Sequence, residues 1–556
     1  MITTFNNNKQ SLFFYAETVL EQRVFSLYRE DAFATLYLRD KDRCSDELDR
    51  TAQQLVGVFL TANENPYIRY SASSRLAKDL AQLVVVELCF FLFLFCFVFK
   101  STFNLNLPCV LLFATQKRFG EVKSGLSGWK PVEDRATFII LDRADDPLTP
   151  LLHAMTFQAM STDLLADRLK KDSKGSKKKK LDEEKSELDE LALPADDDKI
   201  WAKYRHVFIG EVNKRLPKEF TEWRNESAVN GENMSNSDLM KAAQDMPQYQ
   251  QQIRRFKNNL DLAQAVTKRF AEQNLLDIIL LEQDIACWID SDGKKCDREK
   301  LGARCSKDIF LSQDPPKPLR FTKRIYIYVY TYYKYGKELK LRLFMAYLIA
   351  QGGLSDLIRK NLMDQAGFTR EDQDTIMNLS TLNVVLSSAK PPKEGHKNSE
   401  YWSAVQANAK SKTEQTSEET SPIRFLSYLE WALTNHIENT EGKFEEHFPY
   451  GPDKPTGNRA RKRQPTSFRK ARKPNEEKPP VIYIVHIVLV FVLKKLSFSL
   501  IQSGPRVIVY VVGGVTYSEL CTCYELSEKH NIDIFIGSTA ILTPQSYIQQ
   551  LSEKRD

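Results

Sequence analysis

Carboxylates gather in one short stretch of this chain. Asp142, Asp145 and Asp146 follow directly after the apolar run at 138–141. Ligands of open α/β sheets bind at the carboxyl ends of strands, and paired carboxylates can hold Mg²⁺. One interpretation is therefore an α/β enzyme that uses this turn with a phosphorylated ligand. The other is a structural turn, because Asp142 can pair with Arg143, its neighbours can cap the turn, and no phosphate-binding glycine loop is present. We favour the structural turn.

The elements around this turn are predicted to be a strand, a turn and a helix. The run at 138–141 is apolar and rich in β-branched residues, which is typical of a buried strand in a parallel sheet. Pro147 and Pro150 prevent the strand from continuing. A helix is expected from Leu151, with Thr149 as its cap, because apolar residues recur there at helical spacing. These residues are Leu152, Met155, Phe157, Ala159, Met160 and Leu164.

The same order of elements returns near the end of the chain. A strand is predicted at 507–512, followed by a tight turn at Gly513 and Gly514. A helix is predicted at 518–527 and a second strand at 532–536. Neither GxGxxG nor GxxxxGK(S/T) occurs here, so the two glycines indicate close packing of a strand against a helix rather than a phosphate site.

Length and composition exclude several classes of protein. A chain of 556 residues is long enough for about two to four domains. Its 79 basic and 73 acidic residues give a net charge of only +6, so nucleic acid is not an expected partner. The nine cysteines include no CxxC pair and no His/Cys ligand spacing, so neither zinc nor a disulfide framework is indicated. No metal or other cofactor is expected. This cysteine pattern makes a reduced cytosolic compartment the expectation, and residues 1–8, which lack the features of a signal peptide, agree with it.

Both blocks resemble one known family. The stretch LDRADDPLTPLLHAMTFQAMSTDLL at 141–165 is similar to the central signature of SM proteins, the Sec/Munc family of syntaxin-binding regulators of SNARE-mediated membrane fusion. RVIVYVVGGVTYSE at 506–519, followed by IFIGST at 534–539 and LTP at 542–544, resembles the C-terminal block of that family. The signature residues, expected to be structural, are Asp142, Arg143, Asp146, Pro147, Pro150, Gly513, Gly514, Glu519, Gly537, Ser538, Thr539 and Pro544.

The resemblance implies binding rather than catalysis. SM proteins cradle syntaxin-type SNAREs in a cleft between their first and third domains, and they template or guard the four-helix SNARE bundle. The implied function is regulation of vesicle docking and membrane fusion, in exocytosis or intracellular trafficking. The implied location is the cytoplasm, with peripheral attachment to membranes through the SNARE partners.

The expected fold is α/β plus α, an SM-type arch in three parts. Residues 16–134 are assigned to a truncated first α/β domain, and 135–245 together with 481–556 to a second, parallel-sheet domain. A mostly helical domain, 246–480, is inserted between its two halves. Because only about fifteen residues precede the first part, residues 16–84 are expected to expose strand edges and an unpaired hydrophobic face. We therefore expect weak binding of syntaxin.

The expected partner contacts lie in loops and in one helical hairpin. Cys296–Asp314 falls where SM proteins carry a hairpin that touches the vesicle SNARE, although the proline at the tip of that hairpin has no counterpart here. Basic loops at Lys177–Lys180 and Arg459–Lys473 are candidates for contact with anionic lipid, and plain solvated loops are the alternative. The second loop could also serve nuclear import or contact an acidic SNARE surface. The candidate partner-binding residues in the hairpin are Lys300, Arg304, Lys307, Asp308 and Phe310.

Three hydrophobic stretches, 83–113, 325–335 and 481–493, interrupt the family pattern. In the first, Glu87 and Lys100 bracket only twelve residues. A membrane span needs about 20 apolar residues, so a buried or aggregation-prone insert is expected instead. Our hypothesis is that untranslated sequence has entered the reading frame at all three places. Sequencing of mature transcripts tests this hypothesis. Continuous coverage that encodes all three inserts would refute it.

Overall fold

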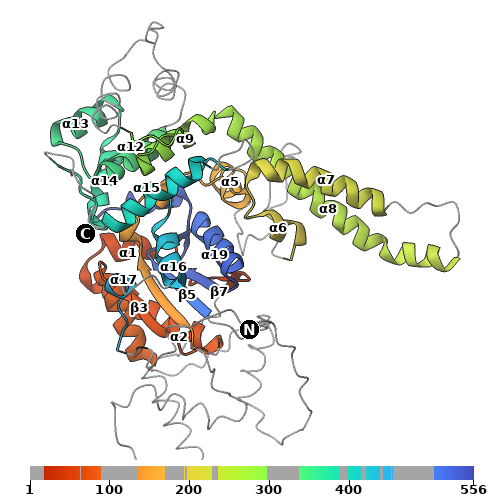
Figure 1. The fold of residues 1–556 in the computed structure, drawn as a ribbon, viewed down its shortest axis with the longest axis horizontal. Helices are drawn as coiled ribbons and strands as arrows, with labels where there is room; N and C mark the ends of the chain where they lie inside the picture. Colours follow the sequence, from red (N-terminus) through yellow and green to blue (C-terminus); the bar gives the residue numbers. More distant parts are fainter. Residues whose placement is uncertain are drawn as a thin grey trace, which may run out of the picture.

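A computed structural model of the chain has a six-stranded sheet at its centre (Figure 1). The strands lie in the order β1-β2-β7-β5-β4-β3. Neighbouring strands are parallel, except that β1 pairs antiparallel with β2. The expected class, α/β with an additional helical part, is confirmed. The structure describes residues 18–62, 64–88, 135–169, 193–194, 197–227, 236–296, 337–388, 399–414, 421–438, 443–452, 454 and 506–555.

The strands of the sheet come from both ends of the sequence. Near the start are β1 (Thr18–Glu21), β2 (Val24–Ser26), β3 (Tyr67–Tyr70) and β4 (Thr137–Asp142); near the end are β5 (Arg506–Val512) and β7 (Asp533–Ser538). A separate parallel pair is formed by β6 (Val515–Thr516) and β8 (Ile541–Leu542). The strands predicted at 138–141, 507–512 and 532–536 are therefore present as β4, β5 and β7.

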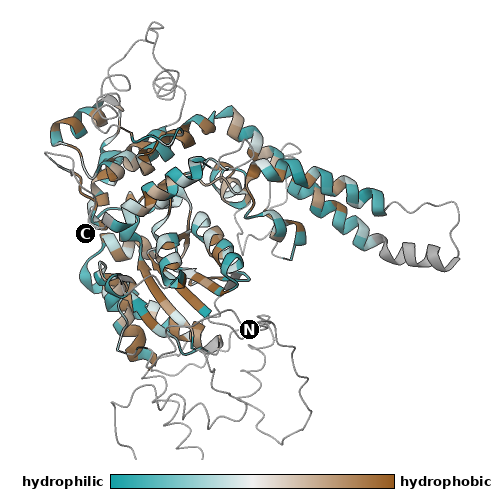
Figure 2. Ribbon diagram, viewed as in Figure 1, coloured by the Kyte–Doolittle hydropathy of each residue, from teal (hydrophilic) through white to brown (hydrophobic). Residues whose placement is uncertain are grey.

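Alternation along β4 assigns its side chains to two hydrophobic cores. Phe138 and Ile140 pack into a core with α2 (Lys41–Thr61) and the helical residues 75–88. Ile139 and Leu141 belong to a second core, which continues into α19 (Tyr517–His530), α20 (Pro544–Leu551) and the inserted helices. Successive side chains of a strand point to opposite faces, so a sheet with helices on both faces needs continuously apolar strands. Figure 2 shows the central strands as hydrophobic ribbons.

Residues 18–84 belong to this same sheet. Their strand β2 pairs with β7, and their strand β3 pairs with β4. Leu55, Phe59 and Leu80 are fully buried in the core that covers one face of the sheet. The expectation of an unpaired hydrophobic face in this segment was therefore wrong. The division into three domains stays a prediction, and the sheet crosses its first expected boundary at 134.

Many of the remaining described helices belong to a part of the molecule that extends away from the sheet (Figure 1). Two of them, α7 and α8, pack side by side and project as a long arm, which we call the α7–α8 arm. Phe157, Trp201 and Phe256 anchor this arm in a third core. The α-helices not yet given are α1 (Ala32–Leu38), α5 (Phe157–Leu164), α6 (Lys199–Tyr204), α7 (Ile209–Ser227), α8 (Asn236–Glu272), α9 (Leu275–Cys287), α12 (Lys337–Gln351), α13 (Asp356–Gln365), α14 (Arg370–Asn378), α15 (Ser399–Glu414), α16 (Tyr428–Glu438) and α17 (Lys443–His447). The 3₁₀ turns are η1 (Arg143–Asp145), η2 (Thr149–Leu151) and η5 (Leu379–Leu382).

The helix expected from Leu151 begins six residues later than predicted. Thr149–Leu151 forms the 3₁₀ turn η2, and α5 begins at Phe157. Between them the chain is extended, and Thr156 forms a β-bridge with Phe208. Tertiary pairing of this segment thus overrides the helical spacing of its apolar side chains.

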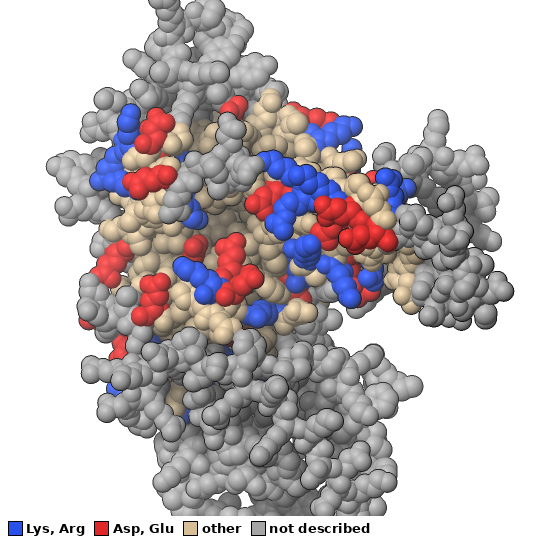
Figure 3. Space-filling view, turned by 45° about the vertical axis from the view of Figure 1, so that its right-hand side comes forward, with Lys and Arg blue, Asp and Glu red and all other residues tan. Residues whose placement is uncertain are grey.

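The described surface carries both signs of charge. On the face drawn in Figure 3, basic and acidic side chains lie interspersed. Among the described residues, no helix is both long and apolar enough to cross a membrane. Of the first hydrophobic insert, only 83–88 are described; they are helical, and Val84 and Leu88 are buried. The other two inserts lie outside the described residues.

Candidate functional site

The acidic turn lies at the carboxyl end of β4. Asp142, the last residue of this strand, accepts a hydrogen bond from the Ala144 N–H at 2.9 Å and so caps η1. The same oxygen accepts a hydrogen bond from the Tyr37 hydroxyl at 2.5 Å, and the other oxygen accepts one from the Ser74 hydroxyl. Both oxygens of this buried carboxylate therefore have donors from the protein itself.

Asp146 joins the turn to the helical part of the molecule. Its Oδ1 accepts hydrogen bonds from the backbone N–H groups of Leu148, at 3.2 Å, and Thr149, at 2.9 Å. Its Oδ2 accepts hydrogen bonds from the Thr149 hydroxyl at 2.5 Å and from the Tyr428 N–H, at the start of α16, at 3.0 Å. One buried carboxylate thus fixes both η2 and a helix 282 positions away in the sequence.

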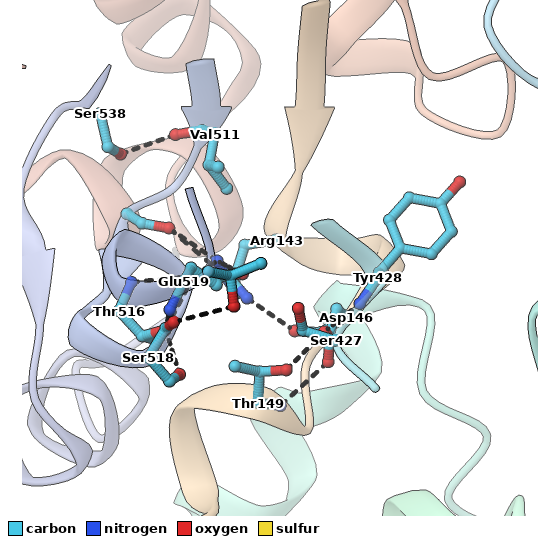
Figure 4. A network of polar contacts seen from close by, with 12 residues as sticks. Arg143, Asp146, Thr149, Ser427, Tyr428, Val511, Thr516, Ser518, Glu519 and Ser538 are labelled. Carbon is cyan, nitrogen blue, oxygen red and sulfur yellow. Dashed lines mark hydrogen bonds and ion pairs between the residues drawn. The ribbon is translucent and has the colours of Figure 1, made fainter. Parts of the chain in front are cut away.

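Arg143 and Glu519 form a buried ion pair between the two signature blocks (Figure 4). Nη2 of Arg143 lies 2.8 and 2.7 Å from the two carboxylate oxygens of Glu519. The guanidinium also donates to the carbonyl oxygens of Gly514 and Asp146. Glu519 in turn accepts from the N–H and the hydroxyl of Thr516, which completes a capping box at the start of α19. Burial alone would lower the pKa of Arg143, but the Glu519 carboxylate prevails and raises it.

The signature glycines lie where side chains approach the backbone closely. Gly513 and Gly514 adopt φ of +87° and +108°, a conformation that favours glycine. A Cβ on Gly514 would lie 2.5 Å from Leu542. A Cβ on Gly537 would lie 2.1 Å from the ring of Phe25. Leu542 belongs to β8 and Phe25 to β2, so these two contacts are with strands, whereas the sequence indicated a strand packed against a helix.

The other signature residues also make contacts within the protein. The Ser538 hydroxyl donates to the Val511 carbonyl at 2.6 Å, and the Thr539 carbonyl accepts from the Ser26 hydroxyl at 3.3 Å. The Pro147 carbonyl accepts from the Tyr547 hydroxyl at 3.2 Å. Pro150 is buried in η2, and Pro544 is the first residue of α20.

Asp145 differs from its two neighbours. Its Oδ1 accepts a hydrogen bond from the Ser73 hydroxyl at 2.6 Å, whereas its buried Oδ2 has no hydrogen-bond partner among the described residues. Burial, and then the Asp142 carboxylate, raise the pKa of Asp145 to about 7.

The expected partner-binding residues Lys300, Arg304, Lys307, Asp308 and Phe310 lie outside the described residues, as do the basic loops at Lys177–Lys180 and Arg459–Lys473. The structure therefore does not test their proposed contacts. Helices α9 and α12, which precede and follow the hairpin segment, pack against each other within the large core.

Sequence reasoning missed the residues from other segments that donate hydrogen bonds to the acidic turn. Tyr37 and Ser74 come from α1 and from the turn after β3, and each lies far from Asp142 in the sequence. It also missed the buried pair of His153 and Glu282, whose Nδ1 and Oε1 lie 2.8 Å apart. A Ser-rich turn before a helix was the only local signal, and it indicates a cap rather than a partner.

This arrangement is suited to holding elements together. Asp142 and Asp146 direct their oxygens at donors of the protein, and Arg143 is committed to Glu519. Within the ranges that the structure describes, no group of three or more His, Cys, Asp or Glu side chains could hold a metal ion. The geometry therefore favours the structural turn over the phosphate-dependent enzyme.

The fold and the site define a class of protein: an α/β sheet with a long helical insertion, joined by a buried polar network. The chain belongs to the Sec1 family, whose model matches residues 5–550.

Relatives extend over most of the chain. Protein transport protein sec1 of Dictyostelium discoideum is 26% identical over 537 residues, which cover 96% of this chain and 76% of that protein. The SNARE-interacting protein KEULE of Arabidopsis thaliana is 24% identical, with 92% of this chain and 71% of that protein covered. Among solved structures, Unc18 in the Unc18–syntaxin 1 complex of Monosiga brevicollis has a TM-score of 0.60 at 20% identity, over 96% of this chain and 75% of that chain. The SM protein Vps45 in complex with the Qa SNARE Tlg2 has a TM-score of 0.57 at 17% identity, over 96% of this chain and 75% of that chain.

Proposed function

We infer that this protein binds a syntaxin-type SNARE and the assembled SNARE bundle, and thereby regulates vesicle docking and membrane fusion. The observation that carries this inference is membership of the Sec1 family along nearly the whole chain. The fold is also similar, over 96% of the chain, to that of Unc18 in a complex with syntaxin 1.

The protein acts by binding rather than by catalysis. Strand ends in an open α/β sheet are the usual place for a ligand. Here the carboxylates at the end of β4 hold Tyr37, Ser74, Thr149 and the backbone of Tyr428. This internal use of the acidic turn supports a scaffold whose partners bind elsewhere.

The hairpin segment Cys296–Asp314 is the proposed contact with the SNARE bundle. It joins α9 to the chain that leads to α12, and these two helices share a core with the sheet. Lys300, Arg304, Lys307, Asp308 and Phe310 would make the contacts, with basic side chains facing an acidic SNARE surface.

Membranes are the proposed location of this activity. The protein would reside in the cytoplasm and attach peripherally through its SNARE partners. The basic loops at Lys177–Lys180 and Arg459–Lys473 would add contact with anionic lipid, because clusters of Lys and Arg near a membrane are attracted to its surface.

Titration of a syntaxin cytoplasmic segment, and separately of an assembled SNARE bundle, tests the proposal. Lys300→Glu with Arg304→Glu is expected to weaken binding of the bundle by about tenfold or more, as expected for reversal of charge at an interface. The matched control is Lys41→Glu with Arg50→Glu, the same charge change at exposed positions of α2. Failure of the wild-type protein to bind either ligand would overturn the proposed function. Equal losses in the two double variants would show that the hairpin is not the contact.

A further inference from the structure

Tyr28 adopts a backbone conformation that suits few side chains. Its φ of +52° lies in the left-handed region, where a large aromatic residue is sterically unfavourable. Four other described residues besides glycine have positive φ: Asn274, Asn383, Asn531 and Trp288. Asparagine tolerates this conformation, and Trp288 is buried in the core. Tyr28 differs from all four, because it is neither asparagine nor buried and is 51% exposed.

The fold requires the backbone turn at this position but not the ring. The Leu27 N–H donates to the Ser538 carbonyl at 3.0 Å, and the Arg29 N–H donates to the carbonyl of the next residue at 2.9 Å. These bonds fix the loop after β2 to the end of β7, and asparagine at position 28 would allow them equally. The Tyr28 ring and hydroxyl form no hydrogen bond, aromatic pair or cation–π pair with the residues that the structure describes. The strain is therefore retained for a side chain that the fold itself does not use, and outliers of this kind gather at functional sites.

The carboxyl groups of this loop outnumber its cation. Glu30 and Asp31 are both exposed, and the Asp31 side chain is 71% accessible. Arg29 turns inward, where its Nη2 lies 2.7 Å from Oε2 of the buried Glu47. The Nε of Arg29 also lies 3.6 Å from Asp31. One cation thus faces three carboxyl groups, and the loop presents an aromatic ring beside an excess of negative charge.

The loop is anchored before any partner arrives. The Gln550 side chain, on α20, donates to the Glu30 carbonyl and accepts from the Ala34 N–H, the latter at 3.2 Å. The Tyr28 N–H donates to the Ser26 hydroxyl at 3.1 Å. A loop that is already ordered loses little conformational entropy on binding.

We propose that residues 28–31 form a docking surface for a basic segment of a partner protein. A Lys or Arg side chain of that segment lies over the Tyr28 ring, and neighbouring cations pair with Glu30 and Asp31. This surface shares no residue with the hairpin segment Cys296–Asp314, so the inference goes beyond the proposed function and does not rest on it.

The charge of the loop selects this kind of partner. A cation is attracted to the face of an aromatic ring, and complementary charges fix the register of a contact. An acidic segment would place like charges opposite Glu30 and Asp31. A wholly apolar segment would remove water from these two carboxylates and give nothing in return. A basic segment is the partner that uses both the ring and the carboxylates.

Binding of a defined peptide to the full chain tests the role of the ring. The probe is a fluorescein-labelled peptide of about ten residues, alternating Arg and Ser, titrated by fluorescence anisotropy. Tyr28→Asn is expected to weaken binding by about two- to fivefold, the range of an exposed cation–π contact. It is also expected to raise the melting temperature, because asparagine tolerates positive φ. Tyr28→Phe keeps the ring and should bind as the wild type does. Equal affinity of the wild type and Tyr28→Asn, or a lower melting temperature in that variant, would overturn the proposal.

The same titration tests the role of the charges. Glu30→Gln with Asp31→Asn is expected to weaken binding by about fivefold, as two exposed ion pairs are lost. The matched control is Glu222→Gln with Glu226→Gln, the same charge change at exposed positions of α7, which should leave binding unchanged. Equal losses in the two double variants would show that the peptide binds acidic surface in general, and the proposal would fail.

Photocrosslinking tests the chemistry of the natural partner. A benzoylphenylalanine residue at position 28 of the full chain, in its own cells, is expected to crosslink to a protein segment rich in Lys and Arg. Mass spectrometry identifies the crosslinked segment. Crosslinks to lipid or to an acidic or apolar segment would contradict the proposal, as would the absence of any crosslink.

Discussion

Arg143 and Glu519 are 376 positions apart in the sequence, yet Nη2 of Arg143 donates to both carboxylate oxygens of Glu519, at 2.8 and 2.7 Å. Their side chains are only 1% and 2% exposed. This pair ties the turn after β4 to the start of α19. Because Arg143 also donates to the Gly514 carbonyl, one guanidinium connects the two signature blocks of the family.

Removing one partner of this pair is expected to be strongly destabilising. Arg143→Met leaves the Glu519 charge buried without its cation, and breaking a buried pair costs about 3–5 kcal/mol. Urea unfolding measures the loss. The control is Arg75→Met, because Arg75 is 81% exposed and pairs with Asp79 on the surface, where a pair contributes about 0–1 kcal/mol. Equal losses in the two variants would contradict the buried role of Arg143.

Gly514→Ala is expected to destabilise more than Gly367→Ala. Both glycines adopt positive φ, of +108° and +67°, so each substitution incurs the strain of that conformation, roughly 1–2 kcal/mol. At Gly514 the new Cβ also meets the buried Leu542 at 2.5 Å, whereas nothing lies within 4 Å at Gly367. Overpacking adds about 1–3 kcal/mol. Thermal unfolding of the two variants separates the backbone strain from the overpacking. Identical melting temperatures would show that the Leu542 side chain moves aside at no cost in stability.

His153→Asp is expected to unfold the sheet and helical parts together. Glu282 is fully buried and accepts from both the backbone and the ring of His153. An aspartate would place a second carboxylate against it, at a cost of about 3 kcal/mol or more. His153→Asn, which keeps a donor, should cost about 1 kcal/mol. Resistance to limited proteolysis and syntaxin binding should fall together in the aspartate variant. A folded variant that selectively loses binding would point to a direct contact instead.

The stability of the protein is expected to fall in acid partly through Glu282. Burial would raise the pKa of this carboxyl, but the contact with His153 prevails and lowers it. A lowered pKa contributes stability above the unfolded value, 4.5, and that contribution is lost as pH falls through the folded value. Glu282→Gln should therefore flatten the acid limb of the unfolding free energy. Asp277→Asn, an exposed change on the same helix, should leave that limb unchanged.

The sequence by itself determined the local elements and the family. Continuous apolar runs gave β4, β5 and β7, and the two ordered signature blocks indicated the SM fold and its SNARE-related function. These features depend on residues a few positions apart, and period and turn chemistry act over that range. The tight turn at Gly513 and Gly514 could be predicted for the same reason.

Only the tertiary structure decided which segments meet. Residues 18–84 belong to the six-stranded sheet because β2 and β3 pair with β7 and β4, and no local pattern specifies such partners. Likewise, Arg143 could pair with Asp142 or with Glu519, and burial beside α19 selected Glu519. Asp145 is a further example, because its neighbours in the sequence indicate only a capping residue. Its hydrogen bond from the Ser73 hydroxyl, at 2.6 Å, exists only because β3 and β4 lie side by side in the sheet.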